Sequence, residues 1–341
     1  MSLPSPMRRF LLIALACAFV SRAANVPRPE FPEPQFERTD WMTLNGEWQF
    51  AFDDADAGLD GHWNDAAHAL DRRIVVPYCF ESKLSGIADT GFHPWIWYRR
   101  EVTLPESWKT RRTLLHFGAV DYRAEVWVNG QMAASHEGGN TPFWFDVTPL
   151  VKPGANVITV RAWDPPQDKL IPRGKQYWEP KSKGIFYTRT SGIWQPVWLE
   201  AAGPAYLERI HIRPDPLGTV TFDGIVDRAK DGDQVRVSIL DGETEISRGT
   251  ADVAQGRASL SLRVVHPHDW SPEDPKLYNV TLEVLRNDQQ LDRVRSYFGF
   301  RTVETRDGRV LLNGKPIYLK FVLDQGYWPE SILTPPSEQA I

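Results

Sequence analysis

The sequence predicts a mainly β fold, in which β-sandwiches precede the first strand of a (β/α)8 barrel. From Trp41 onward, short runs of alternating apolar and polar residues are bounded by turn residues, as is typical of strands. Between residues 41 and 330 we find no convincing amphipathic helix longer than a few turns. Near the end of the chain, an almost continuous apolar run suits a strand that is buried on both faces.

The length of the chain allows two to three domains. It has 341 residues, of which 42% are hydrophobic, so a sizeable core can be buried. We expect a signal peptide over residues 1–23, a first β domain over 24–204, a second over 205–303, and the start of a barrel over 304–341.

The first 23 residues have the pattern of a signal peptide. Arg8 and Arg9 are basic, residues 10–20 are apolar but too few to span a bilayer stably, and residues 21–23 offer a cleavage site. A secreted or periplasmic location is therefore expected. Cys17 offers a weaker alternative, a lipoprotein-type cleavage. Cleavage after residue 23 would leave Cys79 as the single cysteine, so the fold needs no internal disulfide.

The first domain begins with a proline-rich lead-in over residues 24–40, which is typical of an extended segment. Residues 123–128 alternate and end at Asn129-Gly130, a pair that favours a hairpin because both residues tolerate a positive φ. Further alternating strands are predicted at residues 156–162 and 196–200.

The second domain contains regularly spaced strands with polar turns. Turn pairs occur at residues 241–242 and 287–288. This spacing predicts a β-sandwich of roughly 95 residues. Its alternating runs are residues 208–213, 234–240, 260–263 and 280–284.

The last segment has a different pattern. Residues 309–323 contain a hairpin at Asn313-Gly314 followed by the apolar run, and a polar, aromatic loop follows at 324–329. Ser337 then suits the cap of a helix. A strand, a loop and a helix start predict the first unit of a (β/α)8 barrel, which needs about 250 residues and is therefore expected to be truncated here.

A series of motifs resembles glycoside hydrolase family 2, which includes β-galactosidases, β-glucuronidases and β-mannosidases. Each motif alone is unspecific, but they occur in the family's order over most of the chain. They are residues 44–50 (LNGEWQF), 97–102 (WYRREV), 115–121 (LHFGAVD), 126–130 (VWVNG), 138–146 (GGNTPFWFD), 190–194 (TSGIW), 197–200 (VWLE), 270–278 (WSPEDPKLY), 298–304 (FGFRTVE) and 312–317 (LNGKPI).

The resemblance implies a jelly-roll, sugar-binding-type domain, an immunoglobulin-like sandwich and a catalytic barrel. It also implies a retaining mechanism in which two glutamates, about 5–5.5 Å apart, act as acid/base and nucleophile. Both family positions follow the first barrel strand at a distance, so no catalytic residue is assigned to this chain. Phe321 stands where members often have glycine, and residues 184–190 lack the acid that larger β-galactosidases place there, which argues against a β-galactosidase.

Four residues are candidates for substrate binding: Asp324, Gln325, Tyr327 and Trp328. They occupy the first loop after the predicted barrel strand, on the face that carries active sites in such barrels. The alternative is a loop that packs on the first domain.

Other polar or aromatic groups are assigned mainly to structure. Residues 169–183 form a basic loop that is either solvated or faces an acidic sugar. Asp53, Asp54 and Asp56 lack calcium-loop spacing and are expected at the surface. No metal or cofactor motif is found. Four further residues are expected to pack within or at the edge of the first sandwich: His93, Trp95, Trp97 and His116.

We therefore expect the N-terminal part of a retaining exo-β-glycosidase that acts on an oligosaccharide or glycoside. A non-catalytic carbohydrate-binding protein and a structural adhesin remain alternatives. The net charge of −5, with Lys and Arg spread along most of the chain, gives no reason to expect nucleic acid or an anionic membrane as a partner. No membrane span is predicted, and a homo-oligomer is compatible with the sequence. We also expect the chain alone to be inactive and residues 305–341 to be poorly ordered or aggregation-prone, because a lone strand exposes an unpaired edge.

Overall fold

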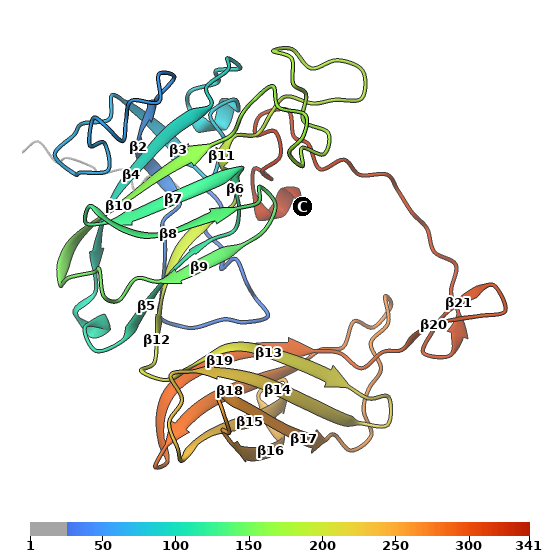
Figure 1. Cartoon of the computed structure of the whole chain (residues 1–341). Coiled ribbons are helices and arrows are strands. Elements are labelled where there is room, and N and C mark those ends of the chain that lie inside the picture. The colour runs from blue at the N-terminus through green and yellow to red at the C-terminus, as the bar shows by residue number, and fades with distance from the viewer. Residues whose placement is uncertain (1–25) are drawn as a thin grey trace, which may run out of the picture.

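The computed structural model describes residues 26–341 and contains two β-sandwiches followed by a small hairpin sheet and a C-terminal segment (Figure 1). The predicted signal peptide and Cys17 lie outside the described residues. No helix within the described part of the chain is long and apolar enough to cross a membrane. The prediction of a mainly β fold is confirmed, since the only helices in residues 26–341 are three short 3-10 turns, Lys83–Ser85 (η1), Glu106–Trp108 (η2) and Glu338–Ala340 (η3).

The first sandwich is a jelly roll made of a four-stranded and a six-stranded antiparallel sheet, with strand orders β1-β12-β5-β9 and β3-β2-β4-β10-β7-β8. A two-stranded pair, β6 and β11, closes one end. The strands are β1 (Trp41–Thr43), β2 (Gly46–Phe52), β3 (Arg72–Val76), β4 (Trp95–Leu104), β5 (Arg112–Phe117), β6 (Val120–Asp121), β7 (Arg123–Val128), β8 (Gln131–Glu137), β9 (Phe143–Asp146), β10 (Gly154–Trp163), β11 (Gly192–Ile193) and β12 (Val197–Ala202).

Alternation along these strands builds the core between the two sheets. In β4, Ile96 and Tyr98 point into the main core, whereas Trp97 joins a separate cluster on the outer side of the six-stranded sheet. The predicted hairpin at Asn129-Gly130 joins β7 to β8, and both residues have the positive φ that this turn requires.

The second sandwich is immunoglobulin-like, with a three-stranded sheet of order β13-β14-β17 facing a four-stranded sheet of order β16-β15-β18-β19. Its core is almost entirely apolar and includes Phe222, Val237 and Leu282. The predicted turns at 241–242 and 287–288 join β15 to β16 and β18 to β19. The strands are β13 (Tyr206–Pro214), β14 (Thr219–Asp227), β15 (Asp233–Asp241), β16 (Thr244–Asp252), β17 (Arg257–Arg263), β18 (Tyr278–Arg286) and β19 (Gln289–Phe298).

Arg38 of the lead-in ties the two sandwiches together. Its guanidinium donates to Glu200 Oε2 of the jelly roll at 2.8 Å and to Asp292 Oδ2 of the second sandwich at 2.9 Å. It also donates to Asp292 Oδ1 at 3.2 Å. Burial disfavours the charge on Arg38, but Asp292 and Glu200 hold its pKa above the ordinary value.

After the second sandwich, β20 (Val303–Arg306), β21 (Arg309–Leu312) and β22 (Lys315–Pro316) form a small antiparallel sheet with the predicted turn at Asn313-Gly314. The prediction of a strand over residues 318–323 is wrong for this structure, because that stretch is extended chain without strand pairing. The physical reason is that no neighbouring strand within residues 26–341 lies beside it. Ser337 caps a short 3-10 turn, η3, as its Oγ accepts the Ala340 amide.

Candidate functional site

The four predicted substrate-binding residues lie in the C-terminal segment and do not converge on one pocket. Asp324 is exposed, and its Oδ1 accepts the Gly326 amide at 2.7 Å. Gln325, Tyr327 and Trp328 are half-buried. The Tyr327 ring stacks on Tyr187 of the jelly roll, with ring centres 3.9 Å apart, and the side chains overlap face to face.

Residues 328–336 are anchored on one end of the jelly roll. The Thr334 hydroxyl donates to the Trp194 carbonyl at 2.6 Å and lies 3.1 Å from the Pro77 carbonyl. Tyr78 donates its hydroxyl to the Pro336 carbonyl, and Ile332 and Leu333 pack against the cluster that contains Trp194. The segment therefore fixes Tyr327 beside the β6–β11 end of the sandwich.

This same end buries a group of carboxylates. Ser191 Oγ donates to Asp164 Oδ2 at 2.6 Å, and the Ser191 amide donates to Glu81 Oε2 at 3.2 Å. Gln176 Nε2 donates to Asp121 Oδ2 at 2.6 Å, while Gln176 Oε1 accepts a backbone amide. Three carboxylates from distant parts of the chain are thus gathered and hydrogen-bonded, which we call the carboxylate cluster (Glu81, Asp121 and Asp164).

Burial changes the protonation of the cluster. Loss of solvation raises the pKa of Glu81 to about 7, and the hydrogen bond from Ser191 only partly opposes this rise. Burial also raises the pKa of Asp121, with repulsion from Asp164 adding to the rise, and burial raises that of Asp164. Glu81 Oε1 has no hydrogen-bond partner among residues 26–341. Glu81 therefore keeps a substantial neutral fraction near neutral pH, where an ordinary glutamate is ionised.

Two glycines let the surrounding backbone approach this cluster. A side chain at Gly139 would collide with the Asp121 carboxylate, and one at Gly192 would collide with the Tyr98 hydroxyl. Gly192 also has a φ of +76°, which disfavours other residues. Both positions therefore favour glycine where the motifs at 138–146 and 190–194 place it.

Tyr327 lies within reach of the same electrostatic environment. Burial raises the pKa of its phenol to about 12, and Tyr187 and Asp121 contribute smaller increases in the same direction. The phenol is consequently neutral at physiological pH. It can donate or accept a hydrogen bond and offers an aromatic face, which are the properties that recognition of a sugar ring uses.

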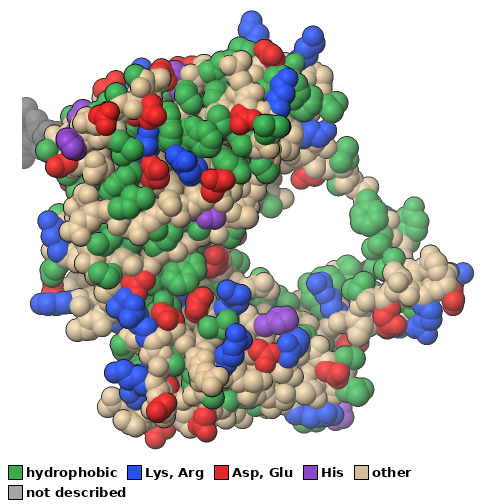
Figure 2. All heavy atoms as spheres, in the orientation of Figure 1, with side chains coloured by type: hydrophobic (Ala, Val, Ile, Leu, Met, Phe, Trp, Pro, Cys, Tyr) green, Lys and Arg blue, Asp and Glu red, His purple; other side chains and the backbone are tan. Residues whose placement is uncertain are grey.

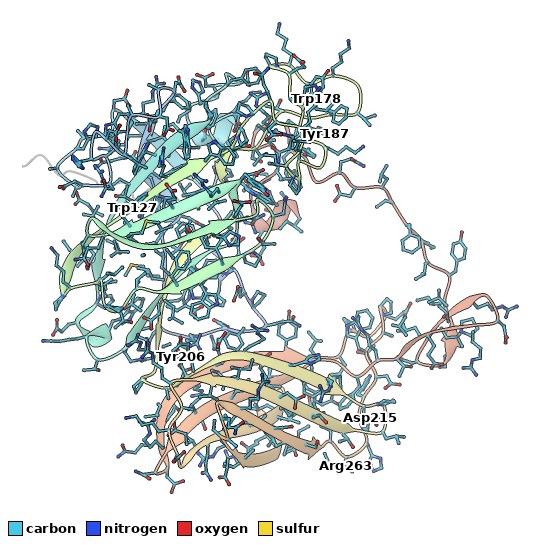
Figure 3. All side chains as sticks on the ribbon, in the orientation of Figure 1. Trp127, Trp178, Tyr187, Tyr206, Asp215 and Arg263 are labelled. Atoms are coloured by element: carbon cyan, nitrogen blue, oxygen red, sulfur yellow. The ribbon has the colours of Figure 1, made fainter. Side chains whose placement is uncertain are left out.

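A long loop, residues 165–188, joins β10 to β11 and rises beside this end of the jelly roll (Figure 3). It contains the predicted basic stretch of residues 169–183, and from here on the name basic loop means the whole of residues 165–188. The buried Arg173 donates to the backbone carbonyls of Pro165 and Asp168 and pairs with Asp164 at 3.8 Å. The Tyr177 and Phe186 rings stack with centres 5.3 Å apart. The loop is thus connected directly to the carboxylate cluster.

The remaining predicted packing residues behave as structure. His116 stacks on Trp198, and burial lowers its pKa to about 4 against the opposing effect of Glu200. Trp97 is fully buried. The expectation that Asp53 lies at the surface is wrong, because its carboxylate accepts the Trp97 indole N–H at 2.9 Å and the amides of two loop residues. No group of three or more possible ligand side chains within residues 26–341 is arranged to hold a metal.

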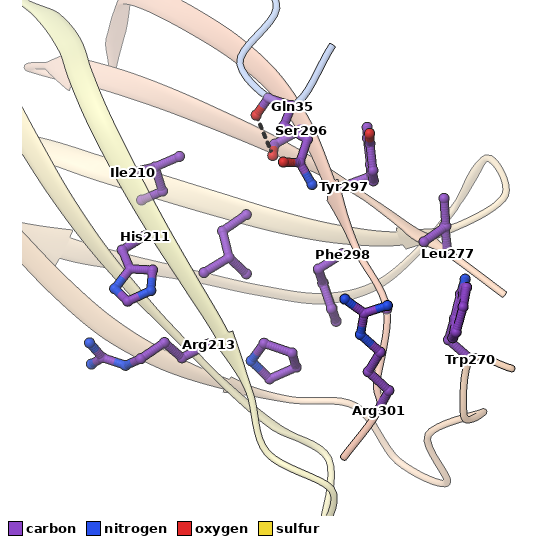
Figure 4. Close-up of a pocket in the computed structure, with 13 residues that line it drawn as sticks. Gln35, Ile210, His211, Arg213, Trp270, Leu277, Ser296, Tyr297, Phe298 and Arg301 are labelled. Carbon is purple, nitrogen blue, oxygen red and sulfur yellow. Dashed lines mark hydrogen bonds between the residues drawn. The ribbon is translucent and has the colours of Figure 1, made fainter. Parts of the chain in front are cut away.

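A separate cavity of about 780 Å³ opens on the second sandwich, along β13 and β19 (Figure 4). Its wall includes His211 and Arg213 of β13, and the Arg301 guanidinium lies 5.0 Å from the centre of the Trp270 ring. None of the predicted substrate-binding residues lines it.

Sequence reasoning missed the carboxylate cluster. Asp121 stands inside a recognised motif, but Glu81, Asp164 and Gln176 belong to no motif, and they lie far apart in the chain. For Asp121 and Gly139 the sequence did offer a signal, because an acidic residue in one motif and a glycine in another are compatible with close contact between the two motifs. The other members are brought together only by the pairing of the sheets.

Comparison with known proteins gives a consistent result. Residues 41–199 match the model "Glycosyl hydrolases family 2, sugar binding domain", and residues 205–301 match the model "Glycosyl hydrolases family 2". The chain is 30% identical over 324 residues to a β-glucuronidase of Canis lupus familiaris, covering 84% of this chain and 48% of that protein. It is 29% identical over 238 residues to a β-galactosidase of Thermoanaerobacter pseudethanolicus, covering 66% of this chain and 31% of that protein.

The crystal structure of a Ruminococcus gnavus β-glucuronidase superimposes with a TM-score of 0.73 over 90% of this chain and 52% of that one. At 22% identity this likeness concerns the fold alone. The chain spans about half the length, or less, of these relatives.

Proposed function

Because the chain belongs to glycoside hydrolase family 2, we propose that it forms the sugar-binding-type and immunoglobulin-like part of a retaining exo-β-glycosidase that works outside the cytoplasm. The hydrolytic step is assigned to the portion of the relatives that this chain does not span. The two glutamates of the retaining mechanism belong to a barrel in that portion, and the 341 residues alone do not hydrolyse glycosides.

The exposed apolar segment after the hairpin sheet carries this proposal. The exposed fractions are 86% for Tyr318, 82% for Phe321, 92% for Val322 and 87% for Leu323. A contiguous apolar stretch of this kind marks a contact surface for another protein part. An extended apolar segment followed by an anchored loop is compatible with the first strand of a barrel, whose neighbouring strands would cover both faces.

The arrangement of the domains leaves room for such a partner. Figure 2 shows an open space bordered by both sandwiches and by the C-terminal segment as it returns to the jelly roll. Tyr327 stacks on Tyr187 of the jelly roll, in the segment that returns from the hairpin sheet to that sandwich. A domain seated there would meet residues 324–328 at its first loop, where barrel active sites lie.

The test measures hydrolysis of a panel of nitrophenyl β-glycosides, including β-glucuronide and β-galactoside. The pure 341-residue chain is expected to give no turnover above background. Reading the coding DNA past codon 341 then decides whether a barrel with two glutamates is encoded in frame, and that longer product is expected to hydrolyse one member of the panel.

Two outcomes contradict the proposal. Turnover by the pure chain would place a catalytic site within these residues. A stop codon after residue 341, together with specific binding of a glycan by the chain, would favour the alternative of a non-catalytic carbohydrate-binding protein.

A further inference from the structure

The basic loop carries a local excess of positive charge on an acidic protein. Residues 165–188 contain five basic and two acidic side chains, a net charge of +3, while the whole chain has a net charge of −5. The ion pair of Arg173 with Asp164 is the only one that the loop forms with residues 26–341. The four lysines of the loop therefore form no ion pair with a described residue. They are Lys169, Lys175, Lys181 and Lys183.

The base of the loop is held firmly although it has no regular secondary structure. Arg173 is buried and donates to two loop carbonyls, while Arg189 donates to the Glu179 carbonyl at 3.0 Å. Gln176 fixes the loop to Asp121. These bonds order the backbone, so the lysine side chains are presented on a defined surface at a reduced entropy cost of binding.

The upper part of the loop combines cations with aromatic and apolar groups. The Lys169 ammonium lies 4.6 Å from the Trp178 ring centre, and Lys181 and Lys183 are exposed. Leu170 is 94% exposed. Figure 2 shows Lys and Arg side chains projecting at the top of the view, in the region where Figure 3 labels Trp178.

A loop with a net charge of +3 whose lysines are not ion-paired produces a local positive potential that attracts an anionic chain with several negative groups. We propose that the basic loop is a binding surface for an acidic glycan, a chain whose sugars carry carboxylates. The choice of a glycan over other polyanions rests on the proposed function. The loop also leads directly to Tyr187, which stacks on Tyr327, so a bound chain would extend toward the candidate site.

The test measures direct binding by the 341-residue chain, without any hydrolysis. The probes are polygalacturonate, its fully methyl-esterified form, which has the same backbone without charge, and single-stranded DNA. Binding is measured by calorimetry at low salt and at about 0.3 M salt, where interactions between exposed charges are largely screened. Polygalacturonate is expected to bind at low salt, and its ester is expected not to bind.

The variant K181Q/K183Q removes two exposed charges, and K152Q/K230Q is the matched control on other exposed surfaces. Each lysine near an anionic surface contributes on the order of a fivefold change in affinity, so the loop variant should bind about 25-fold more weakly. The control should bind as the unmodified chain does. K181R/K183R, which keeps the charges, should retain binding.

Equal binding of the ester and the acid, or unchanged binding by K181Q/K183Q, overturns the proposal. Tighter binding of DNA than of polygalacturonate overturns the assignment to a glycan. The outcome is independent of the hydrolase assay, because the chain can bind an acidic glycan whether or not a longer product is active. A failure here therefore leaves the glycosidase proposal standing, and the reverse also holds.

Discussion

The two sandwiches differ in the groups that compensate their buried carboxylates. In the second sandwich, the buried Asp233 and Asp292 each accept hydrogen bonds from an arginine, Arg286 and Arg38. In the jelly roll, the carboxylate cluster is instead hydrogen-bonded by neutral groups of Ser191 and Gln176. Burying a carboxylate is unfavourable unless it is paired, protonated or hydrogen-bonded, and pairing with an arginine favours the charged form whereas neutral donors oppose the cost of burial only in part. The difference is that burial raises the pKa values of the jelly-roll carboxylates, whereas Arg286 lowers the pKa of Asp233.

The largest expected effect tests whether the two sandwiches behave as one body. R38M leaves Glu200 and Asp292 buried without their shared cation, and we expect a loss of about 3–5 kcal/mol of stability. Urea unfolding measures it, and a separate unfolding step for each sandwich should appear.

The control is R295M, which removes a largely exposed pair with Glu37 and should cost less than about 1 kcal/mol. If R38M and R295M had equal effects, the two sandwiches would be independent, and the Arg38 contacts would have no part in holding them together.

The next effect sharpens the contrast in buried charge. The pKa of Glu81 is about 7 in the folded protein and near 4.5, the ordinary value for a glutamate, when the chain is unfolded. Because the pKa of Glu81 is higher in the folded than in the unfolded chain, its protonation favours the folded state most below about pH 4.5. This contribution is lost as the pH rises from about 4.5 to 7, and the loss of stability is about 3 kcal/mol. E81Q should remove this loss, so its advantage over the unmodified chain should grow between pH 5 and pH 7.5.

Denaturant unfolding of both proteins at the two pH values measures that difference. E106Q, on the surface, serves as the control and should leave the pH profile as it is. A difference between E81Q and the unmodified chain that is the same at both pH values would mean that Glu81 is ionised in the folded protein.

A smaller effect concerns the contact between the jelly roll and the C-terminal segment. Y327A removes the stacking on Tyr187, which is worth about 1 kcal/mol beyond area burial. We expect faster amide exchange over residues 328–336 with little change in the unfolding of either sandwich. Y318A, at an exposed position, should change neither. Unchanged exchange in Y327A would show that the hydrogen bonds of Thr334 and Tyr78 suffice to hold the segment.

The smallest effect is expected where the chain is exposed. F321S/V322S should change stability by less than about 0.5 kcal/mol and should reduce self-association, because these apolar side chains face solvent. V237S, buried in the second sandwich, should instead be strongly destabilising. Strong protection of the amides of residues 318–323 in the unmodified chain would contradict the exposed state of this segment.

Local patterns were sufficient to predict much of the fold. The alternating runs at 123–128 and 280–284 became β7 and part of β18, and the turns at Asn129-Gly130 and Asn313-Gly314 lie where expected. These features depend on neighbours in sequence, through side-chain alternation and positive φ. The strand expected at 318–323 failed because strand formation also requires a partner from elsewhere in the chain.

The candidate site was predicted less completely. The sequence pointed to Tyr327, and the structure gives it a specific stacking partner, but its role in binding a sugar remains a prediction. Asp53 was expected at the surface, but it is buried, and its carboxylate accepts hydrogen bonds from the Trp97 indole and from two loop amides. The error has a physical source, because a run of acids reveals charge but not whether a neighbouring indole and backbone amides will surround it.

By itself the sequence determined many of the strands, the hairpin turns and the family resemblance, because alternation, turn residues and ordered motifs can all be recognised in the sequence alone. Only the tertiary structure decided that Glu81, Asp121 and Asp164 would share one buried environment, and that residues 328–336 would return to the jelly roll. Protonation and contact depend on which distant segments meet, and that is set by the pairing of sheets and by the solvent they exclude.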